Sequence, residues 1–134
     1  MLETTFRNLT EQEETVIRAL LSLNFPGSHE LRAQLPGMKA RQIDENGSLE
    51  LKISGPHAIN LNNGPVAEAS YAEDIPTTIN PIRVHVLLHA RDGKLRMLEV
   101  YKDDSSRLMA PLNPKRFTLF NRFSKTSPEE GNGP

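Results

Sequence analysis

The apolar residues of the chain repeat with a helical period near the N-terminus and mostly with a two-residue period after it. Between Thr10 and Leu23 they form one stripe, and acidic residues and Arg18 occupy most other positions. Thr10 and Glu13 have the spacing of a capping box, in which each side chain bonds the backbone amide of the other residue. We therefore expect an amphipathic helix packed on a core. The stripe consists of Val16, Ile17, Leu20, Leu21 and Leu23.

A second, shorter helix is predicted after the bend at 24–27. Ser28 is a residue type that caps helices, and Leu31 and Leu35 follow one turn apart. Pro36-Gly37 then ends the segment.

Residues 38–54, MKARQIDENGSLELKIS, alternate around Asn46-Gly47 and predict a hairpin. A three-residue turn, with the glycine in the left-handed region, pairs Ile43 with Leu49 and keeps more apolar residues together. A two-residue turn would pair Asp44 with Leu49, so we favour the longer one. The next stretches are a long loop at 54–64, a weakly alternating third strand at 65–72 and a Pro-containing connection at 73–81.

Residues 84–101, VHVLLHARDGKLRMLEVY, give the clearest prediction of a hairpin, with its turn at Asp92-Gly93. A two-residue turn would place Glu99 opposite Val86, and a carboxylate among apolar side chains is costly. We therefore expect a three-residue loop that includes Arg91. In that register Val84 faces Val100, Val86 faces Leu98, His85 faces Glu99, Leu87 faces Met97 and His89 faces Leu95.

Together these elements predict an α+β fold. We expect two N-terminal helices packed on one face of a four- to five-stranded, mainly antiparallel sheet built from two hairpins. The domain is expected to span residues 1–110. A basic, Phe-rich extension at 111–125 would dock on the body or on a partner, and residues 126–134 are expected to be disordered.

Composition narrows the choice of function. The chain has 134 residues, a net charge of -1 and no cysteine, so it offers no thiol chemistry and no global field for nucleic acid. The first residues, MLETTFRNLTEQEE, contain no apolar run, so we expect neither a signal peptide nor a membrane span. These features favour a cytoplasmic protein.

The histidines of the second hairpin are the candidate site residues. His85 and His89 lie four apart on a strand, so their backbones are about 13 Å apart, too far to share one metal ion. His85 and Glu99 could form an acid/base pair. No nucleophile or phosphate-binding motif accompanies them, so we expect a structural pair rather than a catalytic one, with no metal and no cofactor.

The segment 114–125, PKRFTLFNRFSK, combines aromatic and basic residues. Such a segment can bind single-stranded nucleic acid, but the chain as a whole is not basic, so we favour docking on the body, a partner or a second copy. The candidate binding residues are His85, Leu87 and His89 on the hairpin and Lys115, Arg116, Phe117, Phe120, Arg122 and Phe123 in this segment.

Three stretches resemble a family of small, uncharacterised bacterial proteins, many from actinobacteria, that is defined as a domain of unknown function. They are FRNLTEQEETVIRALLSLNFPGSHELRAQL at 6–35, NGSLELKI at 46–53 and RVHVLLHARDGKLRMLEVYKDD at 83–104. Some relatives carry cysteines before the second stretch, and this chain has none. The resemblance implies an architecture and no activity.

The leading hypothesis is a non-enzymatic, protein-binding module of the bacterial cytoplasm, such as an immunity or accessory factor. One alternative is a small enzyme or ligand-binding domain that uses His85 and Glu99. The other is nucleic-acid binding through the basic aromatic segment. A pocket around His85 would favour the enzyme.

Overall fold

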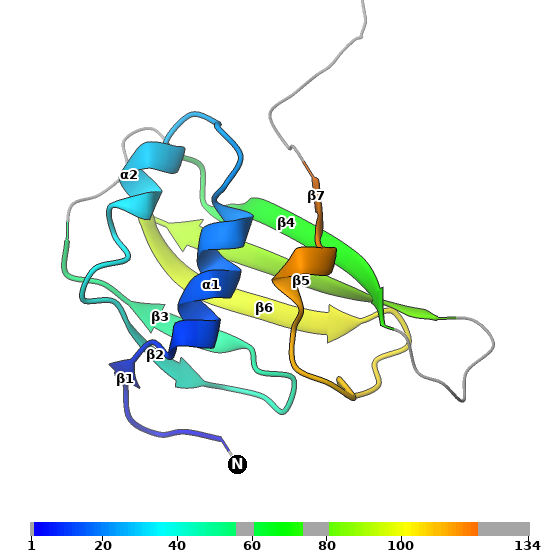
Figure 1. Ribbon diagram of the computed structural model, residues 1–134. Helices are drawn as coiled ribbons and strands as arrows, with labels where there is room; N and C mark the ends of the chain where they lie inside the picture. Colours follow the sequence, from blue (N-terminus) through cyan, green and yellow to red (C-terminus); the bar gives the residue numbers. More distant parts are fainter. Residues whose placement is uncertain (1, 56–60, 74–80, 121–134) are drawn as a thin grey trace, which may run out of the picture.

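The structure is a computed structural model that describes residues 2–55, 61–73 and 81–120. It is an α+β fold in which a seven-stranded antiparallel sheet has the order β1-β2-β3-β6-β5-β4-β7 (Figure 1). The expected count of four to five strands was too low, because the edge strands β1 and β7 are too short to show an alternating pattern. The strands are β1 Arg7–Asn8, β2 Lys39–Gln42, β3 Leu49–Lys52, β4 Gly64–Glu73, β5 Ile82–Arg91, β6 Lys94–Lys102 and β7 Thr118–Phe120.

The helix α1 spans Glu11–Leu20, and Thr10 and Glu13 form the predicted capping box. The helix α2 spans Ser28–Arg32 and begins differently from the prediction. Gly27, at a positive φ of 89°, is its N-cap, and Ser28 is already helical. The Ser28 hydroxyl instead accepts a hydrogen bond from the amide of Phe25 and so closes the bend that precedes the helix.

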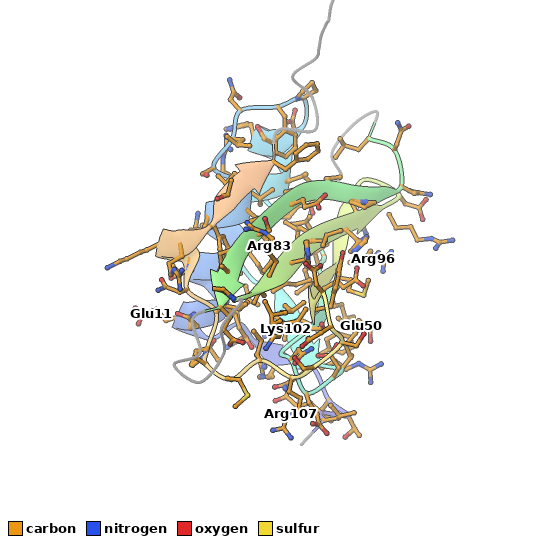
Figure 2. The ribbon with its side chains drawn as sticks, turned by 90° about the vertical axis from the view of Figure 1, so that its right-hand side faces the viewer. Glu11, Glu50, Arg83, Arg96, Lys102 and Arg107 are labelled. Atoms are coloured by element: carbon orange, nitrogen blue, oxygen red, sulfur yellow. The ribbon has the colours of Figure 1, made fainter. Side chains whose placement is uncertain are left out.

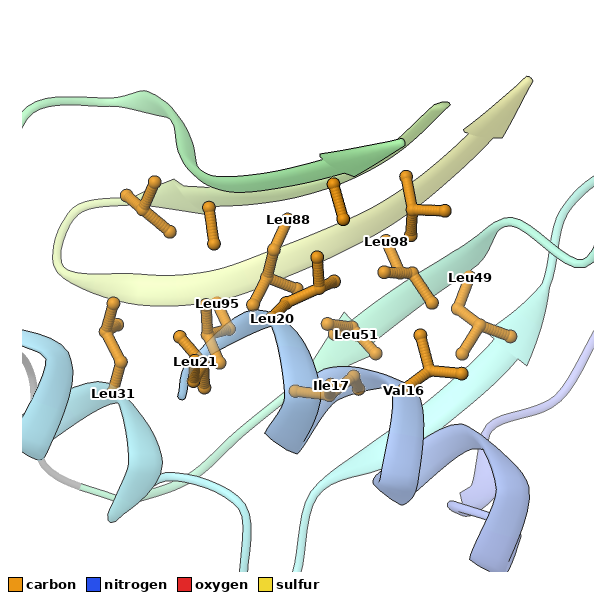
Figure 3. Packing of buried hydrophobic residues seen from close by; sticks show 14 of the residues in the cluster. Val16, Ile17, Leu20, Leu21, Leu31, Leu49, Leu51, Leu88, Leu95 and Leu98 are labelled. Carbon is orange, nitrogen blue, oxygen red and sulfur yellow. The ribbon is translucent and has the colours of Figure 1, made fainter. Parts of the chain in front are cut away.

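The hydrophobic core joins the helices to one face of the sheet. Figure 3 shows Ile17 and Leu20 of α1 packed against leucines of β3, β5 and β6. Alternate residues of the long strands β5 and β6 are buried, as the two-residue period requires. The buried strand residues include Leu49, Leu51, Ala69, Val84, Val86, Leu88, Leu98 and Val100.

The β2–β3 turn is longer than predicted. Gln42 pairs with Leu49, and the amide of Ile43 donates to the carbonyl of Ser48. Four residues, 44–47, are therefore left in the turn. Gly47 has a φ of 87°, in the expected left-handed region. The expected pairing of Ile43 with Leu49 was wrong: Ile43 is exposed, because Asp44 accepts hydrogen bonds from the amides of Asn46 and Ser48 and widens the turn.

The β5–β6 hairpin has a two-residue turn, not the expected three-residue loop. Arg91 pairs with Lys94, and Asp92 and Gly93 both have positive φ, as a type I′ turn requires. A bulge at Arg96 then shifts the register. The buried side chain of Gln34 accepts the amide of Leu95 beside the bulge and donates to the carbonyl of Gly93.

Because of the bulge, the two-residue turn no longer places the Glu99 carboxylate opposite Val86, among apolar side chains. Val86 now faces Val100, and Glu99 lies opposite Leu87 on the other side of the sheet. Val84, Val86, Leu98 and Val100 therefore keep their predicted face, whereas Leu95, predicted opposite His89, lies in the core opposite Ala90. The partners predicted across the two strands were wrong, because residues 84–89 of β5 each meet a residue two positions further along β6.

A buried ion pair lies at the end of the core face. Lys102 Nζ is 2.6 Å from Glu73 Oε1, and both side chains are at most 5% exposed. The other oxygen of Glu73 accepts the amides of Met109 and Ala110, and Lys102 also donates to the carbonyl of Arg107. The pair therefore holds residues 103–112, here called the strap, against the end of the sheet.

The strap leads to a short 3₁₀ helix, η1, at Pro114–Arg116 and then to β7, which pairs with the edge of β4. The Phe117 ring lies 5.7 Å from the Tyr71 ring and packs on the core. In β7, Leu119 pairs in register with Ala69 and Phe120 with Glu68, so these two residues take positions on opposite sides of the sheet.

Several predicted features lie outside the described residues. They are the greater part of the connection 73–81, the centre of the loop 54–64 with His57, the residues Arg122 and Phe123, and the tail 126–134. Within the described part of the chain, neither helix combines the length and apolarity that crossing a membrane requires.

We predict that the Glu73→Gln variant loses about 3 to 5 kcal/mol of unfolding free energy at pH 7, since it leaves the buried Lys102 charge without a counter-ion. Chemical denaturation measures this loss. The control Glu45→Gln removes the exposed ion pair with Arg107 and should cost less than about 1 kcal/mol. A similar loss in both variants would contradict this role of the buried pair.

The unfolding free energy that Glu73→Gln loses should depend on pH. Burial raises the pKa of Glu73, but Lys102 and the strap amides outweigh burial and lower it. A lowered pKa in the folded state means that the stabilisation is complete above the unfolded pKa and is lost as pH falls through the folded one. The difference in unfolding free energy between the native chain and Glu73→Gln should therefore shrink in acid, below about pH 5.

Candidate functional site

The candidate site is the sheet face opposite the core, here called the open face. The described helices, the strap and η1 contribute to the other side of the sheet, and Figure 2 shows Glu11 of α1 and Glu50 of β3 on opposite sides. Residues of the open face alternate with buried ones along each strand. Its central members are Glu68 and Ser70 on β4, Arg83, His85, Leu87 and His89 on β5, and Met97, Glu99 and Tyr101 on β6.

His85 belongs to a cluster at one end of this face. Its Nε2 lies 2.6 Å from Asp103 Oδ1, just beyond the end of β6. Its ring stacks on the Tyr101 ring opposite, with centroids 4.9 Å apart and planes 18° apart. The carboxylate and the phenol ring together fix the orientation of the imidazole.

His89 has a carboxylate of its own. Its Nε2 lies 2.9 Å from Oε1 of Glu99. Glu99 pairs with Leu87, so it lies diagonally across the two strands from His89. The predicted pairing of His85 with Glu99 was therefore wrong, because the shorter turn and the bulge each shift β6 by one residue. The open face instead carries two separate histidine–carboxylate pairs.

Negative charge gathers around Tyr101. Partial burial raises the pKa of its phenol, and the carboxylates of Glu99, Glu68 and Asp103 raise it further because they oppose a second negative charge. Arg83 lies nearby and donates to the Ser70 hydroxyl. Three carboxylates therefore lie around Tyr101 with Arg83 nearby, while Arg91 and Arg96 lie at the turn end of the same hairpin.

Cations concentrate on the outer strands β2 and β3 of the same face. Arg41 forms an ion pair with Glu50 at 2.6 Å. The cationic groups of Arg41 and Lys52 lie 5.3 and 5.5 Å from the centre of the Phe6 ring. These contacts are cation–π interactions, so the charges at this end are already engaged within the chain.

The C-terminal candidates divide between the two sides of the sheet. Phe117 packs on Tyr71, and Arg116 lies 5.9 Å from the same ring, on the core side. Phe120 pairs in register with Glu68, so it occupies an open-face position and is 58% exposed. Lys115 lies in η1 away from the open face.

Asp103 and Tyr101 were not among the predicted site residues. The sequence contains a hint of them, since Glu99, Tyr101 and Asp103 alternate in LEVYKDD and so share one face of a strand. Their meeting with His85 depends on the bulge, which the hairpin sequence does not reveal.

A depression of about 160 Å³ lies on the core side, between the start of α1, the β2–β3 turn and the strap. It is lined mainly by apolar side chains, among them Val16, Leu98, Leu108 and Leu112. None of its lining residues belongs to the open face. Among the described residues, no three histidine, aspartate or glutamate side chains are grouped as metal ligands would be.

Comparison with known families gives one match. A family model described as Domain of unknown function (DUF6984) matches residues 6–111, from just before β1 to the strap. Searches among curated proteins and among solved structures gave no match.

The register can be tested with two double-mutant cycles. We predict a coupling energy of about 0.2 to 1 kcal/mol between His89→Ala and Glu99→Gln, as is typical of a cross-strand pair. His85→Ala and Glu99→Gln should add without coupling, because His85 pairs with Asp103. Unfolding free energies of the native chain, the three single variants and the two double variants measure both values. A larger coupling for His85 would restore the register predicted from the sequence.

Proposed function

The chain belongs to this family, a domain of unknown function, and we propose that it is a protein-binding module whose contact surface is the open face. One observation carries the proposal. The open face combines exposed aromatic and apolar side chains with charges that are already paired, on strands that the core holds rigid.

The composition of the face suits a protein interface. Tyr101 is 40% and Phe120 58% exposed, and Leu87 and Met97 are half-buried on the same face. Tyrosine, phenylalanine and methionine are enriched at such interfaces. The charged groups are held in hydrogen-bonded pairs, so a partner need not leave isolated charges unpaired.

The sheet also suits recognition because it is rigid. The open-face side chains project from strands whose other side lies in the core, so their positions are fixed before binding. A preorganised surface loses less conformational entropy on association than a loop does. We propose further that the chain acts as an immunity or accessory factor in a bacterial cytoplasm. The absence of cysteine is compatible with such a reducing compartment.

A small enzyme is the second candidate. The observation in its favour is the pair of oriented imidazoles, each within 2.9 Å of a carboxylate. A histidine held by a carboxylate is the usual arrangement of a general base. Small-molecule titrations that shift the ring resonances of His85 and His89 would favour this candidate over a protein partner.

We predict that Leu87→Glu abolishes recovery of a partner, because it replaces a half-buried apolar side chain at the centre of the face by a charged one that the contact would have to desolvate. Affinity capture from the native cytosol, with mass spectrometry, measures the recovery. Met109→Glu is the matched control, since Met109 is an exposed apolar residue of the strap, away from the open face. A partner that is retained by Leu87→Glu and lost by Met109→Glu would overturn the proposed surface.

A further inference from the structure

Resting on the proposed function of the open face, we infer that its partner is a basic polypeptide segment anchored by arginine. The guanidinium would lie against the Tyr101 ring and pair with one of the two carboxylates beside it, Glu99 or Asp103. Each part of this site is present in the described structure.

The carboxylates on either side of Tyr101 keep unused acceptors. Glu99 Oε1 bonds His89, and Asp103 Oδ1 bonds His85. The second oxygen of each has no hydrogen bond within the described part of the chain. Their side chains are 41% and 58% exposed, so a ligand can reach them.

Each of the two carboxylates is close enough to bond a cation that lies on the Tyr101 ring. Glu99 and Tyr101 lie on β6 and Asp103 directly follows it, so each acid is two residues, about 7 Å of extended backbone, from the tyrosine. Asp103 is held by the imidazole of His85, which is stacked on the same phenol ring. The carboxylates and the ring therefore form a preorganised set.

The negative charge around Tyr101, Glu99 and Asp103 favours a positively charged ligand. Glu68 adds a third carboxylate near Tyr101, and Arg83 is the only guanidinium of the central described strands that bonds a side chain there, at Ser70. Nucleic acid and other polyanions would be repelled by these carboxylates. A basic protein segment is complementary to them.

Arginine fits the set better than lysine does. A guanidinium is planar, so it can stack on an aromatic ring while its edge donates two hydrogen bonds to a carboxylate. The ammonium group of lysine is a point charge that cannot do both. Cation–π contact at an exposed site changes affinity by about two- to fivefold.

The test uses a short peptide in which arginines alternate with glycine and serine, together with its lysine and citrulline counterparts. Each is titrated into the full chain at millimolar concentration and followed by chemical shifts of the backbone amides and the histidine rings. We expect the arginine peptide to shift Tyr101, His85 and Glu99. We expect the lysine peptide to bind at least about twofold more weakly and the neutral citrulline peptide not to bind.

Three variants identify the groups that bind. Glu99→Gln with Asp103→Asn should abolish binding of the arginine peptide, and Tyr101→Leu should weaken it about two- to fivefold, whereas Tyr101→Phe keeps the ring and the affinity. The control Glu11→Gln with Glu14→Gln changes the net charge equally on the exposed side of α1. It should leave binding unchanged.

The inference is overturned by an arginine peptide that causes no shifts. It is also overturned by equal affinities for the arginine and lysine peptides, or by equal losses in the two double variants. Failure of the arginine anchor can be distinguished from failure of the open face as a binding surface. A partner lost by Leu87→Glu but retained by Glu99→Gln with Asp103→Asn and by Tyr101→Leu would leave the open face as the binding surface and exclude the arginine anchor.

Discussion

The alignment of β5 with β6 is the constraint on which both faces of the sheet depend. The type I′ turn at Asp92-Gly93 favours one register, while the apolar residues of the two strands require another. The extra residue Arg96 reconciles them. The core keeps a continuous apolar face, and the same shift places His85 beside Asp103 and His89 beside Glu99.

The bulge is supported from outside the hairpin. Gln34 is buried, and its amide group bonds both Gly93 and Leu95, so the segment after α2 clamps the turn and the strand that follows it. Without such a partner, the Leu95 amide beside the bulge would be buried and unsatisfied, at a cost of about 1 to 3 kcal/mol. The geometry of the open face therefore depends on a contact made on the core side.

The buried pair of Lys102 and Glu73 has a comparable role for the C-terminal part of the chain. It closes the end of the core and binds the strap through backbone groups, so that η1 and β7 can follow along the edge of β4. The family match ends within the strap, at residue 111. The strap thus joins the part shared with the family to an edge strand that places Phe120 beside the open face.

The sequence by itself determined the capped first helix, the positions of the long strands and the side of the sheet on which most of their residues lie, Leu95 being an exception. These follow from local rules, namely the capping box of Thr10 and Glu13 and the two-residue period of the strands. The tertiary structure decided the partners across the strands, because register depends on the bulge and on Gln34, which is distant in sequence. The edge strands β1 and β7 likewise form only where a longer strand offers free backbone groups, so no pattern of their own reveals them.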